Sequence, residues 1–198
     1  AGVDGSHRFL KRLWRLVQEA ESSPTQSLET ATLDKAQKAL RRKTHETIAK
    51  VSDDYGRRQT FNTAVAAVME LCNEVSRHDG QSAEDAMVIH EALSSAVLLL
   101  APIVPHISQA LYQTLTGAHL LDATWPVVDE SALTRDEIDI VVQVNGKVRA
   151  KIAVAADADK DAVQEIALAH ENVQRFIEGV SIRKIIVVPR KLVNVVAN

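Results

Sequence analysis

Three basic residues at alternate positions, Lys147, Arg149 and Lys151, have the spacing in this sequence that most directly suggests chemistry. They lie in the segment 141–154, VVQVNGKVRAKIAV, where no acidic residue interrupts them. Alternate side chains of a β-strand project from one face, so a strand here would present three cations in a row. Such a row suits the phosphates of a polyanion and predicts a nucleic-acid contact. The alternative is that these cations only protect an edge strand from aggregation.

The residues around this row predict a β-hairpin. Asn145-Gly146 suits a type I′ turn, because both central positions of that turn need a positive φ. The strand after the turn is expected to have an apolar face opposite its cations, made of Val148, Ala150, Ile152 and Val154. Aromatic residues are only 4% of the chain and none lies in the hairpin, so we expect phosphate and ribose contacts there rather than base stacking.

The spacing of apolar residues divides the chain in two. Before Trp125-Pro126 apolar residues recur every three or four positions, which predicts an antiparallel bundle of five helices over residues 1–120. From residue 138 the period is two, which predicts a small α+β domain of ββαββ order over residues 138–198. Residues 121–137 are expected to be a linker. The predicted fold class is therefore a mixed chain of two units.

Single residues predict where the helices begin and end. Gly56 is expected to stop the second helix, Pro105 to open the fifth, and Thr60, Ser82 and Asp159 to act as N-caps. Around Gly56, paired acids precede paired bases with i,i+4 spacing. We therefore expect ion pairs from Asp53 to Arg57 and from Asp54 to Arg58 rather than a catalytic carboxylate pair.

Charge is distributed unevenly, although the formal net charge is only −3. Residues 1–60 carry a net charge of +4, residues 61–137 of −9 and residues 138–198 of +2. Binding to nucleic acid depends on local patches, so the acidic average does not exclude it. Besides the hairpin row, the candidate RNA-contacting cations are Arg8, Lys11, Arg12, Arg15, Arg57, Arg58, Arg183, Lys184, Arg190 and Lys191.

No arrangement of residues is typical of a catalytic or metal site. The phosphate-binding and zinc-protease motifs are absent, and the seven histidines have no spacing that suits metal ligands. We expect surface or capping histidines, a buried Cys72 that serves only as packing, and no catalytic residue, metal or cofactor in this chain. Apolar stretches are shorter than the roughly 20 residues of a membrane span, so we expect no membrane contact. The single cysteine suits a reduced setting, and we expect a cytoplasmic location.

Several stretches resemble bacterial leucyl-tRNA synthetases. Residues 53–71, DDYGRRQTFNTAVAAVMEL, resemble their helical anticodon-binding-type domain. PIVPHI at 102–107 and Trp125-Pro126 are similar to segments shared by the leucine, isoleucine, valine and methionine enzymes. VQVNGKVRAK at 142–151 and residues 180–196 resemble the C-terminal domain of the leucine enzymes. Arg190 departs from the pattern, since many members have glycine after the proline.

The resemblance implies a fragment of a class I aminoacyl-tRNA synthetase. The parent enzyme uses ATP and Mg²⁺ to charge tRNA(Leu), but its His-Ile-Gly-His and Lys-Met-Ser-Lys-Ser motifs are not in this sequence. The fragment alone is expected to be inactive. Its implied role is to position tRNA(Leu), as a monomer that works with the catalytic and editing domains of the same parent chain. The alternative is a helical protein–protein interaction module with an acidic docking face in residues 61–137.

Overall fold

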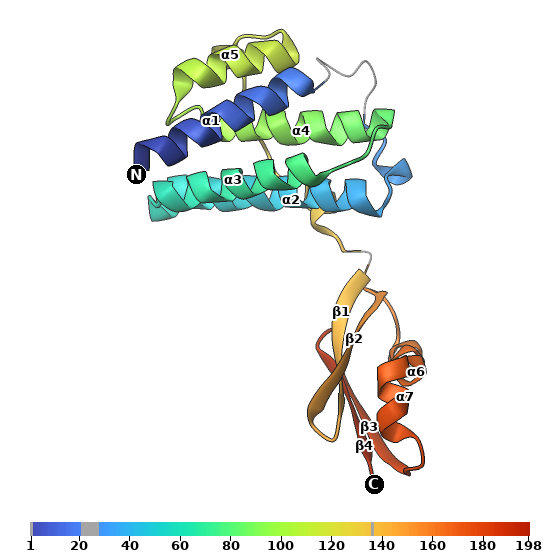
Figure 1. Ribbon diagram of the computed structural model, residues 1–198. Coiled ribbons are helices and arrows are strands. Elements are labelled where there is room, and N and C mark those ends of the chain that lie inside the picture. The colour runs from blue at the N-terminus through green and yellow to red at the C-terminus, as the bar shows by residue number, and fades with distance from the viewer. Residues whose placement is uncertain (1, 21–27, 136) are drawn as a thin grey trace. The chain divides into compact units, whose positions relative to one another are not determined.

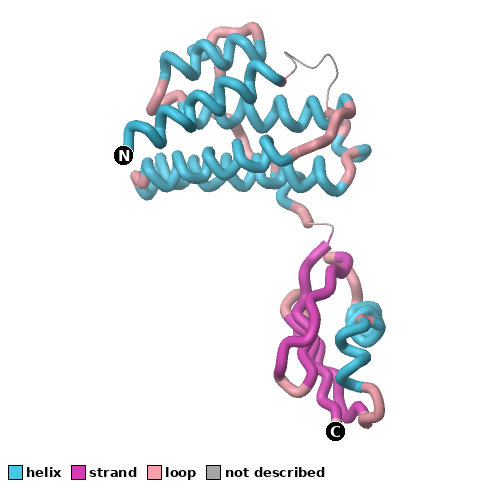
Figure 2. The backbone as a smooth tube through the Cα atoms, viewed as in Figure 1, coloured by secondary structure: helices cyan, strands magenta, loops and turns pink. Residues whose placement is uncertain are grey.

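The computed structural model describes residues 2–20, 28–135 and 137–198, and the chain forms two compact units that divide between Thr134 and Arg135. The first unit is helical and the second combines a sheet with two helices (Figures 1 and 2). The predicted class, a helical bundle followed by a small α+β unit, is confirmed.

Five α-helices build the first unit. Buried apolar side chains of α4 meet those of α2, α3 and α5. α4 lies at the centre, because it buries Leu93, Ala96 and Val97 completely. The bounds are α1 (Gly2–Glu19), α2 (Lys35–Asp53), α3 (Phe61–Arg77), α4 (Ala83–Leu100) and α5 (Pro105–Thr116).

Three of the predicted helix signals are confirmed and two are wrong. Pro105 is the first residue of α5, and the side chains of Ser82 and Asp159 accept hydrogen bonds from the third backbone N–H of their helices. Gly56 does not stop α2; the chain continues through a π-helical turn, η2 (Asp54–Arg58), and turns at Gln59 with a φ of 55°. Thr60 occupies the N-cap position of α3, but its side chain makes no capping hydrogen bond.

The buried carboxylate of Asp54 explains why the Thr60 side chain does not cap α3. It is 1% exposed and accepts hydrogen bonds from Lys50 Nζ at 2.7 Å and from Thr60 Oγ1 at 3.0 Å. A buried carboxylate must be surrounded by donors, and Thr60 therefore turns to it rather than to the start of α3.

The second unit is a four-stranded sheet with both helices on one face (Figure 2). The strand order is β2-β1-β4-β3, in which β1 and β4 are parallel and the outer pairs antiparallel. The expected single helix of the ββαββ order is followed by a second short one. The bounds are β1 (Glu137–Val144), β2 (Lys147–Ala155), α6 (Lys160–Ala169), α7 (Glu171–Ile177), β3 (Ile182–Val188) and β4 (Leu192–Ala197).

The predicted hairpin turn is confirmed. Asn145 and Gly146 both have positive φ, at 51° and 77°. The Asn145 side chain also donates to the carbonyl of Ala197 and accepts from its N–H, both at 2.9 Å. The turn is thereby tied to the end of β4, which the hairpin's own sequence does not show.

The segment expected to be a linker packs on the helical unit over most of its length. Residues 120–133 contain two short turns, η3 (Leu120–Asp122) and η4 (Glu130–Leu133). Trp125 Nε1 donates to Ser52 Oγ at 2.8 Å, and Asp129 accepts from Arg41 Nη2 at 2.6 Å. These partners lie 73 and 88 residues away in sequence, and local patterning does not reveal them.

We therefore propose that the linker is confined to the junction of the two units. Trypsin is expected to cut first after Arg135, while staphylococcal V8 protease cuts slowly after Glu130, because η4 is held by Asp129. In an Asp129→Ala variant, cleavage after Glu130 should accelerate several-fold, as followed by mass spectrometry. Early cutting inside either unit, before Arg135, would contradict this assignment.

Candidate nucleic-acid interface

Lys147, Arg149 and Lys151 do not form one cationic row, so that prediction is wrong. A β-bulge interrupts the hairpin: Val142 pairs with Ala150 but Gln143 pairs with Val148, which leaves Arg149 without a partner residue. One extra residue inverts the alternation of faces. Lys147 therefore lies opposite the buried Val144 on the helix-covered face, whereas Lys151 lies opposite Val141 on the open face.

The bulge also changes what Arg149 and Val148 do. The guanidinium of Arg149 stacks 3.6 Å from the centroid of the Phe176 ring on α7. Its Nε is buried and has no hydrogen-bond partner among the residues described. Arg149 thus joins β2 to α7 by a cation–π contact. Val148, expected on the apolar core face, is 63% exposed.

Lys151 is already paired. Its Nζ lies 2.8 Å from Asp139 Oδ2 on the neighbouring strand, and both side chains are exposed. Lys147, by contrast, is exposed and makes no hydrogen bond or ion pair with any residue that the structure describes. Of the three predicted hairpin cations, Lys147 alone therefore has its charge free for a phosphate.

The other predicted cations of this unit gather at the two ends of the sheet. Arg183 and Lys184 begin β3, and with Lys147 they lie at the end marked by the Asn145-Gly146 turn. We call these three residues the hairpin-end cations. All three are exposed, and no described residue pairs with their side chains. Lys147 and Lys184 lie on the two outer strands, roughly 14 Å apart across three strand spacings.

Arg190 and Lys191 lie at the opposite end of the sheet, in the β3–β4 turn. Arg190 has a φ of 59°, a left-handed conformation that glycine adopts without strain.

The predicted cations of α1 divide between its two sides. Arg8, Lys11 and Arg15 lie on the side away from the buried residues of the helix and face solvent. Arg15 forms a surface ion pair with Glu19 at 3.7 Å. Arg12 turns inward: its guanidinium lies 5.9 Å from the Phe9 ring centroid, and its Nε is buried.

Arg57 and Arg58 share one carboxylate. Arg57 Nε lies 2.6 Å and Arg58 Nε 3.0 Å from the oxygens of Asp53. The hydrogen bond from Arg57 lowers the pKa of Asp53 below its ordinary value. The predicted pair of Asp53 and Arg57 is confirmed, while that of Asp54 and Arg58 is wrong, since Asp54 pairs with Lys50.

Sequence reasoning missed two buried polar clusters of the helical unit. In the first, Arg41 lies 3.2 Å from Glu91 and 2.6 Å from Asp129, and His45 contacts the same two acidic residues. In the second, Asp85 accepts hydrogen bonds from His78, Ser82 and Gln37.

His45 and His78 correct the prediction that every histidine is a surface or capping residue, because both side chains are buried and paired. His119 and His170 do cap short helices as expected. Arg41 and His45 have the i,i+4 spacing of a shared helix face, but their surroundings come from segments far away in sequence.

Apart from these clusters, few of the described side chains could act as a nucleophile or as metal ligands. Cys72 is buried, as predicted, and burial raises the pKa of its thiol to about 12. Within residues 2–20, 28–135 and 137–198, no group of three or more His, Cys, Asp or Glu side chains could hold a metal ion. None of the described helices is both long and apolar enough to cross a membrane.

Known proteins resemble this chain over its full length. The family model for the anticodon-binding domain of tRNA ligase matches residues 37–165. The chain is 60% identical to the leucine–tRNA ligase of Alcanivorax borkumensis and 58% identical to that of Saccharophagus degradans, and it is covered completely in both. It is 54% identical to the leucine–tRNA ligase of Vibrio parahaemolyticus.

A solved structure shows the same fold. It is the LeuRS of Agrobacterium radiobacter K84 in a ternary complex with tRNA and LeuAMS, with a TM-score of 0.73 and 24% identity over 98% of this chain. The match covers 25% of that protein. The chain likewise spans about a quarter of the length of the curated relatives that it matches, 23–24% in the three named above.

Proposed function

Because the chain belongs to the anticodon-binding domain family of tRNA ligases, we propose that it positions tRNA(Leu) for aminoacylation by a catalytic domain outside this sequence. The observation that carries the proposal is the set of solvent-facing cations without carboxylate partners. Among the predicted cations these are the hairpin-end cations, Arg190 and Lys191 on the second unit, and Arg8 and Lys11 on α1.

In this proposal the chain acts by holding the tRNA in place. Lysine and arginine side chains that contact phosphates fix the register of an RNA without reading its bases. Binding energy that is gained far from the reacting atoms can be used to orient the 3′ end of the tRNA. ATP and Mg²⁺ would act in the catalytic domain of the parent enzyme. The chain itself is expected to form no leucyl-adenylate, to be a monomer and to work in the cytoplasm.

The protein-interaction alternative receives less support from the structure. Its docking face was to be the acidic region 61–137, but five of the acidic side chains there form ion pairs within the helical unit. The internally paired acids are Glu70, Glu74, Asp85, Glu91 and Asp129. A basic partner would have to compete with these internal bases for their charges.

A binding titration tests the proposal. The 198-residue chain is mixed with tRNA(Leu) at 50 mM and at 200 mM salt, with a tRNA for another amino acid as competitor. Neutralising three or four phosphates should make the affinity fall by about 30- to 100-fold between the two salt concentrations. Preference for tRNA(Leu) with this salt dependence would support the function. Absence of binding at 50 mM salt would overturn it.

A further inference from the structure

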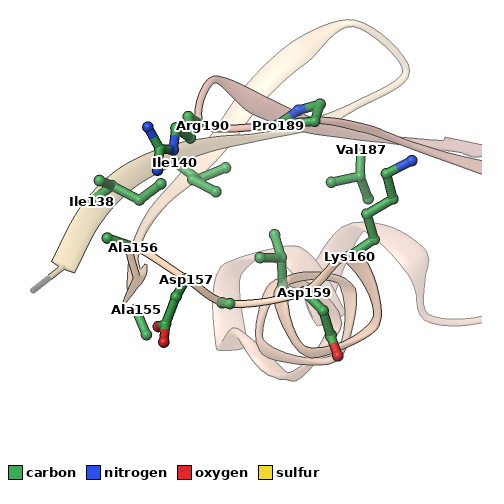
Figure 3. Close-up of a pocket in the computed structure, with 12 residues that line it drawn as sticks. Ile138, Ile140, Ala155, Ala156, Asp157, Asp159, Lys160, Val187, Pro189 and Arg190 are labelled. Atoms are coloured by element: carbon green, nitrogen blue, oxygen red, sulfur yellow. The ribbon is translucent and has the colours of Figure 1, made fainter.

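A small cavity lies in the second unit beneath the start of β1 (Figure 3). Its volume is about 140 Å³, and its walls come from β1, the β2–α6 connection, α6, β3 and the β3–β4 turn. Four larger aliphatic side chains line it: Ile138, Ile140, Val163 and Val187. All the lining residues belong to one compact unit.

Two cations border the cavity and two carboxylates turn away from it. Lys160 and Arg190 lie on the strand side of the connecting loop, whereas Asp157 and Asp159 point to its far side (Figure 3). Asp159 is also engaged as the N-cap of α6, where it accepts from Ala162 N at 2.8 Å. Lys160 and Arg190 are exposed and have no hydrogen bond or ion pair to the described part of the chain. The charge offered to a ligand at this rim is therefore positive.

Arg190 occupies its position at a conformational cost. Its φ of 59° is one that glycine would adopt freely, yet an arginine stands there beside the cavity. Residues that are held in strained backbone regions cluster at ligand clamps and similar functional sites. The strain here places a guanidinium at the mouth of an apolar cavity.

The volume of the cavity limits the ligand to one ring. An apolar protein cavity of roughly 150 Å³ holds one benzene molecule. A pyrimidine ring therefore fits the 140 Å³ available here, whereas the two fused rings of a purine do not. The matching ligand has a single flat ring and an anionic group that reaches the rim. An unstacked pyrimidine nucleotide has this combination, and loops of folded RNA expose such bases to proteins.

We propose that the cavity receives one unpaired pyrimidine nucleotide of the bound tRNA. The ring enters among the aliphatic side chains, and its two flanking phosphates lie against Arg190 and against Lys160, which stand on opposite sides of the cavity (Figure 3). This inference rests on the proposed tRNA-binding function and adds a subsite to it.

The test follows the methyl signals of Ile140, Val163 and Val187 by NMR in the full chain. The probes are CMP, UMP, GMP and ribose 5-phosphate, and then tRNA(Leu). CMP and UMP are expected to shift these methyl signals saturably. GMP and ribose 5-phosphate should not, because the first is too large and the second has no base. In the complex with tRNA(Leu) the same signals should move.

Arg190→Gly is the informative variant, because glycine suits the backbone at this position. Its thermal midpoint should be no lower than that of the wild type, so a loss of binding cannot be ascribed to misfolding. Together with Lys160→Gln it is expected to weaken CMP binding at least fivefold. Arg175→Gln is the matched control: it removes an exposed cation of the same unit that is paired with Glu171 and does not line the cavity.

The outcomes separate this proposal from the function on which it rests. If tRNA(Leu) binds and the three methyl signals stay fixed, the cavity is not a subsite while the proposed function stands. Equal shifts with GMP or with ribose 5-phosphate would overturn the size argument and leave an anion contact only. If tRNA(Leu) does not bind at all, the proposed function fails. A selective response to CMP and UMP would then still show a pyrimidine nucleotide site, and no response to any probe would end the proposal.

Discussion

Replacing Asp85 with alanine is expected to lower the free energy of unfolding of the helical unit by about 3–5 kcal/mol. Asp85 is 6% exposed, and its carboxylate accepts from His78 Nε2 at 2.5 Å, Gln37 Nε2 at 3.1 Å and Ser82 N at 2.9 Å. It thereby joins α2, the α3–α4 connection and the start of α4. Alanine would leave these buried donors without an acceptor, which costs more than a hydrogen bond contributes.

The effect should depend on pH in a defined direction. Burial by itself would raise the pKa of Asp85, but the hydrogen bonds from His78, Ser82 and Gln37 outweigh it and hold that pKa well below the ordinary range. A carboxyl group with a lowered folded pKa stabilises the fold above its unfolded pKa of about 3.9, and this contribution is lost as the pH falls. The difference between wild type and Asp85→Ala should therefore be full at pH 7 and shrink below about pH 4.

Urea unfolding followed by tryptophan fluorescence measures this difference. Both tryptophans, Trp14 and Trp125, belong to the helical unit, so the signal reports on that unit alone. Glu84→Ala is the control, since Glu84 is the neighbouring acid on α4, is only half-buried and makes no hydrogen bond or ion pair with the described residues. A loss for Asp85→Ala no larger than that for Glu84→Ala would show that the cluster contributes no special stability.

Removing the hairpin-end cations is expected to weaken tRNA binding strongly and to flatten its salt dependence. Each neutralised phosphate contributes about 0.7–0.9 to the slope of log affinity against log salt, so the triple change K147Q/R183Q/K184Q should reduce that slope by about 2 to 3 units. The reason is geometric. These side chains are exposed and unpaired, and they lie at both edges of one end of the sheet.

A second triple variant with the same change in charge is the control. R57Q/R58Q/K151Q removes three predicted cations that already face carboxylates, at Asp53 and Asp139. An arginine or lysine with a carboxylate partner gains less from a phosphate, because it must first give up that partner. The slope should change by less than about 1 unit. Equal effects of the two variants would mean that net charge, not the position of free cations, governs binding.

Features that depend only on neighbouring residues could be predicted from the sequence alone. The Asn145-Gly146 turn, the caps at Ser82 and Asp159 and the start of α5 at Pro105 follow from backbone preferences that act over at most four residues. The apolar period shows in the same way where helices give way to strands. The family motifs of residues 53–71 and 142–151 are also local, and they were sufficient to indicate tRNA binding.

Tertiary structure decided which polar side chains remain available to a ligand. The bulge at Arg149 arises where the hairpin is fitted to the rest of the sheet, and it removed the cationic row that strict alternation predicts. Arg41 meets Asp129 across 88 residues, and the parallel pairing of β1 with β4 joins segments about 50 residues apart. Such partners are set by packing, because a buried charge must find its counterion wherever the fold brings one. Free and paired cations look alike in the sequence, and only the folded chain distinguishes them.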